Sequence, residues 1–127
     1  VTLSMAGVTS IDSAPPVEFG GPGDKWSPES LLVAAIADCF ILSFKAISRA
    51  SKFDWLSLEC DVEGILDQND KRMQFTHYNL HASLLIAQSD KHALAKRLLE
   101  KAKQSCLITN SLSGETRLTI SIREAQE

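Results

Sequence analysis

The fold of this chain is decided by residues 27–47, which run Ser27-Pro28-Glu29-Ser30-Leu31-Leu32-Val33-Ala34-Ala35-Ile36-Ala37-Asp38-Cys39-Phe40-Ile41-Leu42-Ser43-Phe44-Lys45-Ala46-Ile47. The stretch opens like a helix, because Ser27 is a good N-cap, Pro28 suits the first helical position and Glu29 complements the helix dipole. The apolar side chains then point in almost every direction around the helix, and a helix that is apolar all round has to be buried all round. Near its middle lies Cys39, which is either a reactive thiol or a packing residue.

A helix buried on every side is difficult to cover in a chain of 127 residues. The simplest remedy is a second copy of the chain, so we predict a homodimer with this helix near the two-fold axis. A monomer whose sheet curls around the helix is the alternative. A membrane span is disfavoured, because Asp38, Ser43 and Lys45 interrupt the apolar run.

The composition is typical of a soluble globular protein with a single domain over residues 1–127, at 44% hydrophobic and 23% charged residues. The net charge of −3 and the absence of a basic run give no support to binding of nucleic acid or of an anionic membrane. No signal peptide is visible, and the three cysteines are widely spaced. This pattern favours a reducing compartment, the cytoplasm, over a disulfide scaffold.

On either side of the helix the pattern predicts strands. Residues 1–7 alternate between apolar and polar side chains and predict a strand that turns at Gly7 or at residues 11–13. The stretch 15–24 is rich in Pro and Gly and predicts a loop. After the helix, residues 56–63 and 75–86 alternate in the same way, and we predict an antiparallel hairpin. Its turn is expected at Asp67-Gln68-Asn69-Asp70.

A second helix is predicted after a cap at Ser89-Asp90. One of its faces is an apolar stripe that Cys106 continues, and the opposite, solvent-exposed face is rich in lysine. A loop at residues 110–114 leads to a last strand over 117–123. Strand, buried helix, hairpin, amphipathic helix and strand make an α+β domain.

The three cysteines differ in their predicted surroundings. Cys60 lies on the apolar face of a strand, where it is expected to be a small core residue. A second helix packed on the first could bring Cys39 and Cys106 together. Packing is the default interpretation of both, and a redox pair is the alternative.

Other reactive side chains give little indication of a site. His77 and His81 share the polar face of a strand, and His92 begins the second helix, so the Cys and His spacing does not match a zinc site. The stretch 20–23 contains a proline where a phosphate-binding loop needs an N–H group. The sequence gives no evidence for a metal or an organic cofactor.

Glu29 precedes Cys39 by ten residues, which is about 15 Å along a straight helix. One copy of the helix cannot bring the two side chains together, whereas two antiparallel copies place Glu29 of one chain beside Cys39 of the other. The alternative is that Glu29 only complements the helix dipole.

Two motifs resemble those of a known family. The stretch Phe19-Gly20-Gly21-Pro22-Gly23-Asp24-Lys25-Trp26-Ser27-Pro28-Glu29, followed by Leu31-Leu32-Val33-Ala34-Ala35-Ile36-Ala37-Asp38-Cys39-Phe40, resembles the signature of the OsmC/Ohr family (osmotically inducible protein C and organic hydroperoxide resistance protein). The stretch Gln104-Ser105-Cys106-Leu107-Ile108-Thr109-Asn110-Ser111 resembles its second cysteine motif. The order of elements agrees over essentially the whole chain.

The resemblance implies an intertwined homodimer in which antiparallel sheets from both chains wrap around two long central helices. It also implies a thiol-dependent peroxidase that acts on organic hydroperoxides, and more weakly on hydrogen peroxide, in defence against oxidative stress. Cys39 would be the peroxidatic residue, Cys106 the resolving residue and Glu29 a carboxylate that organises the site. An external dithiol would reduce the Cys39–Cys106 disulfide.

One feature departs from the family pattern. Members commonly supply an arginine from the N-terminal strand region, whereas the first arginine here is Arg49. Lys25, another basic group or a residue upstream of Val1 would have to replace it. The alternative function is therefore a non-catalytic or redox-sensing dimer of the same fold that binds a small molecule.

Overall fold

Helix α1 (Pro28–Ala50) confirms the predicted central helix. Its start is held by a reciprocal pair of hydrogen bonds. The Ser27 Oγ accepts from the backbone N–H of Ser30 at 3.0 Å, and the Ser30 Oγ accepts from the backbone N–H of Ser27 at 2.7 Å. This arrangement is that of a capping box, with Ser30 in the position that glutamate usually takes.

The computed structural model describes residues 1–87 and 89–125, which fall into two units, Val1–Ala35 and Ile36–Glu127. In the first unit β1 (Thr2–Met5) and β2 (Val8–Asp12) form an antiparallel hairpin. Gly7 allows its turn, because a φ of 80° is costly for any residue with a side chain. A short 3₁₀ helix, η1 (Val17–Phe19), interrupts the predicted loop.

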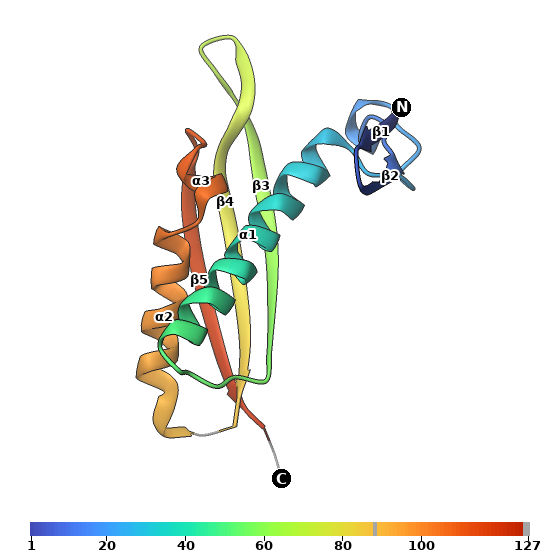
Figure 1. The fold of residues 1–127 in the computed structure, drawn as a ribbon. Coiled ribbons are helices and arrows are strands. Elements are labelled where there is room, and N and C mark those ends of the chain that lie inside the picture. The colour runs from blue at the N-terminus through green and yellow to red at the C-terminus, as the bar shows by residue number, and fades with distance from the viewer. Residues whose placement is uncertain (88, 126–127) are drawn as a thin grey trace. The chain divides into compact units, whose positions relative to one another are not determined.

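The second unit contains a three-stranded sheet with the order β3-β4-β5. Strands β3 (Ser57–Asn69) and β4 (Arg72–Ile86) form the predicted antiparallel hairpin, which is the long arm in Figure 1. Both strands extend further than predicted, so the turn lies at Asp70 and Lys71 and not at 67–70. Both turn residues have positive φ, 47° and 70°, as a tight two-residue hairpin turn requires.

Strand β5 (Glu115–Glu124) runs parallel to β4. The α+β class is confirmed, but the expectation of purely antiparallel sheets is wrong at this strand. The reason lies in the connection, since the chain leaves β4 and returns through α2 (His92–Gln104) and α3 (Leu107–Asn110). Such a long helical crossover brings the next strand back in the same direction.

The core of the second unit lies between the sheet and the helices α1 and α2, which cover one face of the sheet (Figure 1). A 3₁₀ turn, η2 (Ser89–Lys91), precedes α2, so the N-cap of α2 is Lys91 and not the predicted Ser89-Asp90. The Phe44 ring packs edge-on against Phe53 and Trp55, with ring centroids 6.5 and 5.4 Å away. The fully buried apolar side chains come from α1, β4 and α2, and include Ile36, Phe40, Phe44, Leu80, Leu84, Ile86, Ala95, Leu99 and Ala102.

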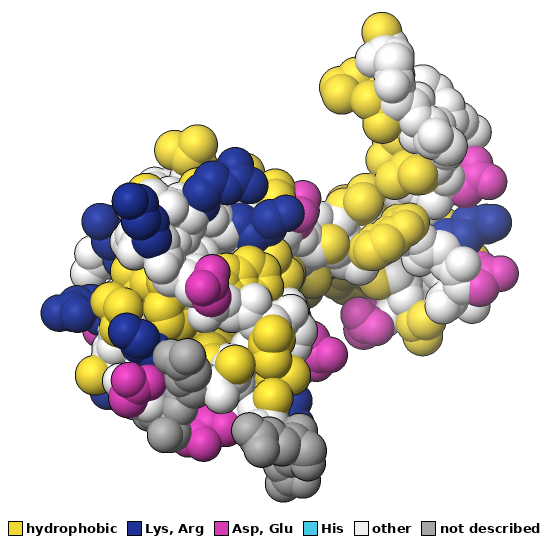
Figure 2. Space-filling view, turned by 60° about the horizontal axis from the view of Figure 1, so that its bottom comes forward, with side chains coloured by type: hydrophobic (Ala, Val, Ile, Leu, Met, Phe, Trp, Pro, Cys, Tyr) yellow, Lys and Arg dark blue, Asp and Glu magenta, His cyan; other side chains and the backbone are white. Residues whose placement is uncertain are grey.

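Helix α1 is not covered on all sides within one chain. Its buried residues are Ile36, Phe40, Phe44 and Ser48, whereas Leu42 is 55% exposed. Figure 2 shows apolar side chains lying open at the surface between charged ones. By length and composition α1 could also cross a membrane, although its buried side packs as the core helix of a globular unit does. The second copy of the chain that would cover these open sides remains a prediction.

Candidate functional site

The second unit brings Cys39 and Cys106 together. Cys39 lies half-buried in the middle of α1, and Cys106 is the residue before α3, with a side chain only 1% exposed. Both thiols are free, and the Cys106 side chain is among the groups that lower the pKa of the Cys39 thiol. Their proximity agrees with the interpretation of the two residues as a pair.

Cys106 does not lie on α2 as its spacing predicted. The helix ends at Gln104, and Cys106 begins the following turn of α3. The Cys106 N–H donates to the carbonyl of Lys103 at 3.3 Å, and its own carbonyl accepts from the N–H of Asn110 at 3.0 Å. The Thr109 hydroxyl donates to the same carbonyl at 3.3 Å. These bonds hold the turn of the chain between α2 and α3. The turn keeps Cys106 buried although the apolar face of α2 ends before it.

The surroundings of Cys39 favour its thiolate. Burial alone raises the pKa of this thiol, but hydrogen bonds from the backbone of Ile108, the thiol of Cys106, the backbone of Leu107 and the hydroxyl of Ser43 outweigh burial and lower the pKa below its ordinary value. Each of these groups is electrically neutral. At many reactive cysteines a neighbouring cation lowers the pKa of the thiol. Here the pKa of Cys39 is lowered by hydrogen bonding to the thiolate.

Two contributions to this site were missed by the sequence analysis. Backbone N–H groups are present at every residue except proline, so the pattern gives no signal for Leu107 or Ile108. Ser43 could have been found, because it follows Cys39 by four residues and so shares its face of the helix. It was interpreted only as a polar interruption of the apolar run.

Cys60 is a different kind of thiol. It is half-buried on β3 opposite Ala82, and its pKa is raised to about 11 by burial first, then by the negative charge of Asp61 and by that of Cys106 in its ionised form. A thiol with this pKa is almost entirely protonated at neutral pH and is a poor nucleophile. These surroundings favour the predicted packing role.

Glu29 belongs to the first unit, so its predicted part in the thiol site remains a prediction. Within that unit it lines an apolar pocket of about 540 Å³ together with Leu3, Phe19 and Leu31. Lys25, the suggested replacement for the arginine, is an exposed residue of the same unit. It lines a separate hollow beside Asp24.

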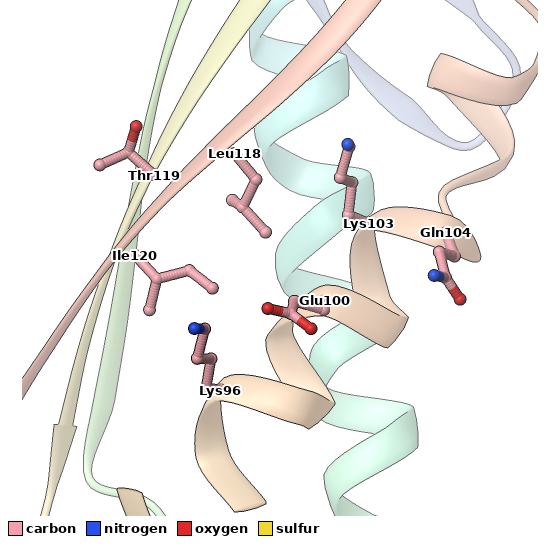
Figure 3. A pocket seen from close by; sticks show the side chains of 7 residues that line it. All are labelled: Lys96, Glu100, Lys103, Gln104, Leu118, Thr119 and Ile120. Atoms are coloured by element: carbon pink, nitrogen blue, oxygen red, sulfur yellow. The ribbon is translucent and has the colours of Figure 1, made fainter. Parts of the chain in front are cut away.

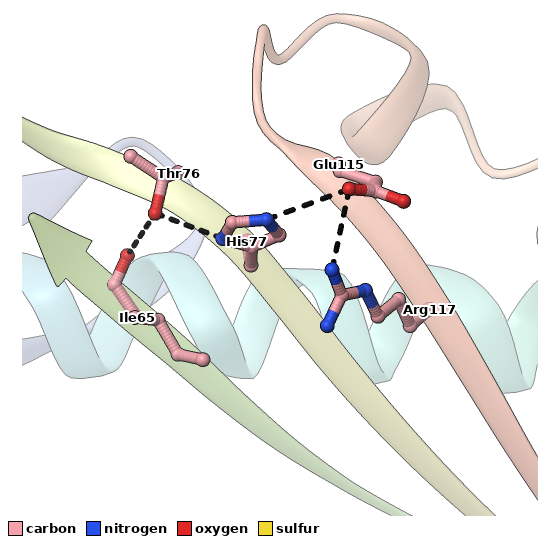
Figure 4. A network of polar contacts seen from close by, with 5 residues as sticks. All are labelled: Ile65, Thr76, His77, Glu115 and Arg117. Carbon is pink, nitrogen blue, oxygen red and sulfur yellow. Dashed lines mark hydrogen bonds and ion pairs between the residues drawn. The ribbon is translucent and has the colours of Figure 1, made fainter. Parts of the chain in front are cut away.

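The histidines lie outside the thiol site. On the outer face of the sheet, Glu115 contacts both His77 and Arg117, with N–O distances of 3.4 and 3.5 Å (Figure 4). The His77 ring also lies 3.0 Å from the Thr76 hydroxyl, and His92 contacts Glu124 at 3.0 Å. Among residues 1–87 and 89–125, no group of three His, Cys, Asp or Glu side chains could hold a metal ion.

A pocket of about 600 Å³ lies between α2 and β5 (Figure 3). Lys96, Glu100 and Lys103 of α2 face Leu118 and Ile120 of β5 across it. This pocket contains no cysteine or histidine, and its charges are solvated surface groups. The thiol pair is the stronger candidate for chemistry.

Comparisons with known proteins identify the family and the fold of this chain. The family model described as OsmC-like protein matches residues 21–121. YmaD, an uncharacterised protein of Bacillus subtilis, is 31% identical over 118 residues, which cover 89% of this chain and 76% of YmaD. An OsmC-like protein of unknown function from Vibrio cholerae superposes with a TM-score of 0.86 at 22% identity, over 94% of this chain and 82% of the other. An organic hydroperoxide resistance protein from Legionella pneumophila gives a TM-score of 0.72 at 25% identity, over 92% and 83%.

Proposed function

Because the chain belongs to the family of OsmC-like proteins, we propose that it is a thiol-dependent peroxidase that reduces organic hydroperoxides in defence against oxidative stress. Hydrogen peroxide is a weaker substrate. The observation that carries the proposal is the juxtaposition of Cys39, whose pKa is lowered, with the buried thiol of Cys106. A similar structure named as an organic hydroperoxide resistance protein supports the choice of substrate.

The reaction follows from the chemistry of the two thiols. The Cys39 thiolate attacks the O–O bond of the hydroperoxide, one oxygen stays on sulfur as a sulfenic acid, and the other leaves as an alcohol after taking a proton. The Cys106 thiol then attacks the oxidised sulfur, which forms a disulfide and releases water. An external dithiol returns both cysteines to thiols and becomes a disulfide itself.

Apolar side chains near the thiol pair suit an organic substrate. Leu107, whose backbone stabilises the Cys39 thiolate, has a side chain that is 75% exposed. An alkyl group that covers such side chains is removed from water, which favours its binding over that of a small polar oxidant.

The proposal includes a homodimer in which the open sides of α1 pack against a second copy. The hairpin of β1 and β2 supports this, because its residues are exposed almost throughout and a lone two-stranded hairpin is marginally stable in water. In an antiparallel pair of α1 helices, Glu29 of each protomer would lie beside Cys39 of its partner and orient the site. The three free thiols are consistent with work in the cytoplasm.

The test is a thiol count by mass after one equivalent of cumene hydroperoxide, followed by peptide mapping. The proposal expects a Cys39–Cys106 disulfide within seconds, with Cys60 still free. Turnover should then continue when a dithiol such as dihydrolipoate is supplied. Three thiols that stay reduced, or that oxidise at one common slow rate, would contradict the peroxidase.

A second candidate function is a redox-sensing or small-molecule-binding dimer. It is favoured by one observation, since the groups that lower the pKa of Cys39 are all electrically neutral. Such a protein would form the disulfide once and keep it. Rapid oxidation without re-reduction by any dithiol would therefore support the sensor over the enzyme.

A further inference from the structure

Strand β5 is an edge of its sheet. Within the described residues β4 is its one strand neighbour, so the other edge of β5 is open to a further strand. The backbone N–H and C=O groups of such an edge can hydrogen-bond to another extended chain. Leu118, Thr119 and Ile120 of this strand line the pocket between β5 and α2, so the open edge faces a hollow (Figure 3).

The two walls of this hollow differ in character. On the strand side, Leu118 and Ile120 are half-buried and continue the apolar face of the sheet to its edge. On the helix side, Lys96 is exposed and Lys103 half-buried, and both point toward the strand with Glu100 between them (Figure 3). The volume of about 600 Å³ is typical of a pocket that holds a ligand. We call this hollow the β5 groove.

The charge of α2 is opposite in sign to that of the chain as a whole. Between His92 and Gln104 the helix has four lysine or arginine side chains and one glutamate, whereas the net charge of the chain is −3. Positive charge is therefore concentrated on this helix, and two of its lysines line the β5 groove. Charge complementarity favours an anionic occupant.

We propose that the β5 groove binds an extended acidic segment of another protein, which adds a strand to β5 and places its carboxylates beside Lys96 and Lys103. The open edge favours a polypeptide, because its N–H and C=O groups pair with a peptide backbone and not with a nucleic acid or a lipid headgroup. The two lysines then select an acidic strand over a neutral or basic one. This inference does not depend on the proposed peroxidase.

The spacing of the lysines sets the spacing of the carboxylates. Helix α2 and strand β5 lie side by side, so a strand added to β5 would run along the helix (Figure 1). Lys96 and Lys103 are separated by about 10 Å along the helix axis, which an extended chain covers in about three residues. Because lysine side chains are long and flexible, acidic residues two or four apart on one face of the added strand can reach both.

The experiment measures the binding of a fluorescein-labelled peptide, in which glutamate alternates with threonine, to the full chain by fluorescence anisotropy at low ionic strength. Lys96→Glu combined with Lys103→Glu should weaken binding by about tenfold, because two attractions become repulsions. Glu100→Lys should tighten binding by about threefold for the converse reason. Hydrogen exchange of the wild type with the peptide bound should show new protection of backbone amides within residues 118–120.

A second peptide tests the backbone pairing. It has proline in place of the central threonine, which removes one N–H donor and is poorly tolerated in a paired strand. It should bind at least tenfold more weakly than the first peptide, by about 1.4 kcal/mol.

The matched control pairs Lys96→Glu with Lys101→Glu, which makes the same charge change at an exposed residue of α2 that does not line the groove. Lys101→Glu should weaken binding less than Lys96→Glu. A wild type that does not bind the glutamate peptide, equal weakening by the two variants, or full binding of the proline peptide would overturn the inference. Tighter binding of a labelled oligothymidylate than of the glutamate peptide would also overturn it, in favour of a nucleic-acid surface.

Discussion

The thiol of Cys106, 1% exposed, lies beside the half-buried thiol of Cys39 and favours its ionised form. The two sulfurs are unequal in access, since bulk solvent and solutes reach Cys39 more readily than Cys106. An oxidant therefore meets Cys39 first, and Cys106 is protected until a sulfenic acid forms next to it. This order is what a peroxidatic and a resolving cysteine require.

Replacing the second thiol should separate the two steps. In Cys106→Ser, one equivalent of hydroperoxide should still convert Cys39 to a sulfenic acid, because the attacking thiolate is intact. No intramolecular disulfide can follow, so a second equivalent should give the sulfinic acid. Mass spectrometry with and without dimedone distinguishes the three states. A Cys60→Ala control should form the disulfide as the wild type does, and a Cys39–Cys60 disulfide in Cys106→Ser would contradict the assigned roles.

Cys60 should make stability fall at high pH. Its folded pKa of about 11 lies above the value for an unfolded thiol, so ionisation favours the unfolded chain. The contribution is fully present below about pH 8.5, the pKa of a free thiol, and is lost as the pH rises toward 11. We expect the unfolding free energy of the wild type to fall by on the order of 2 kcal/mol more than that of Cys60→Ala over this window. Urea titrations at pH 8 and pH 10.5 measure the difference, and parallel losses in both proteins would rule out a buried titrating thiol.

The predicted partnership between protomers can be tested by complementation. Glu29→Gln and Cys39→Ser homodimers should each have little activity. When the two are unfolded and refolded together, one site of each mixed dimer should combine an intact Cys39 with an intact Glu29 from the other chain. About half of the dimers are mixed and one of their two sites is intact, so roughly a quarter of the wild-type activity should return.

Peroxide consumption by the refolded mixture measures this directly. A mixture of Cys39→Ser with Cys106→Ser provides the control for refolding, because both thiols of a pair come from the same chain and no intact pair can form. If Glu29 acts within its own chain, the first mixture will be as inactive as this control.

Leu42 should be essential to the dimer. Its side chain is 55% exposed, and burying the remainder is worth about 1 kcal/mol in each protomer. A charge in its place would be buried without a partner at the interface, at a cost of several kcal/mol. Leu42→Glu should therefore sediment as a monomer where the wild type sediments as a dimer.

The matched control for this variant is Lys101→Glu, an equally drastic charge change at an exposed position of α2. It should leave the sedimentation coefficient unchanged. A wild-type protein that sediments as a monomer at micromolar concentration would contradict the prediction outright.

Much of the fold could be predicted because the start of the central helix and the alternation of the strands are encoded in neighbouring residues. Ser27 and Pro28 mark the start of α1, and the alternation around Cys60 gives the inner face of β3. The expectation of antiparallel sheets was wrong at β5, since side-chain alternation is the same in parallel and antiparallel strands. Only the path of α2 and α3 decides it.

The site was predicted less completely than the fold. The helical period placed Cys106 correctly toward the core, but the period cannot say that α2 stops at Gln104. The backbone donors of Leu107 and Ile108 arise from that stop, because they belong to the turn that follows it. The backbone N–H, which every residue except proline has, becomes part of a site only when the fold places it there.

The parallel pairing of β4 and β5 also sets the order in which the thiol pair assembles during folding. The β3–β4 hairpin closes locally, whereas β5 can join β4 only after the whole intervening segment has been threaded back, and such non-local closure is slow. Cys106 lies in that late segment. In a newly made chain, Cys39 is therefore exposed before Cys106 is in place. The two thiols can form a disulfide only once β5 has completed the sheet. Pulsed alkylation during refolding would measure when this happens.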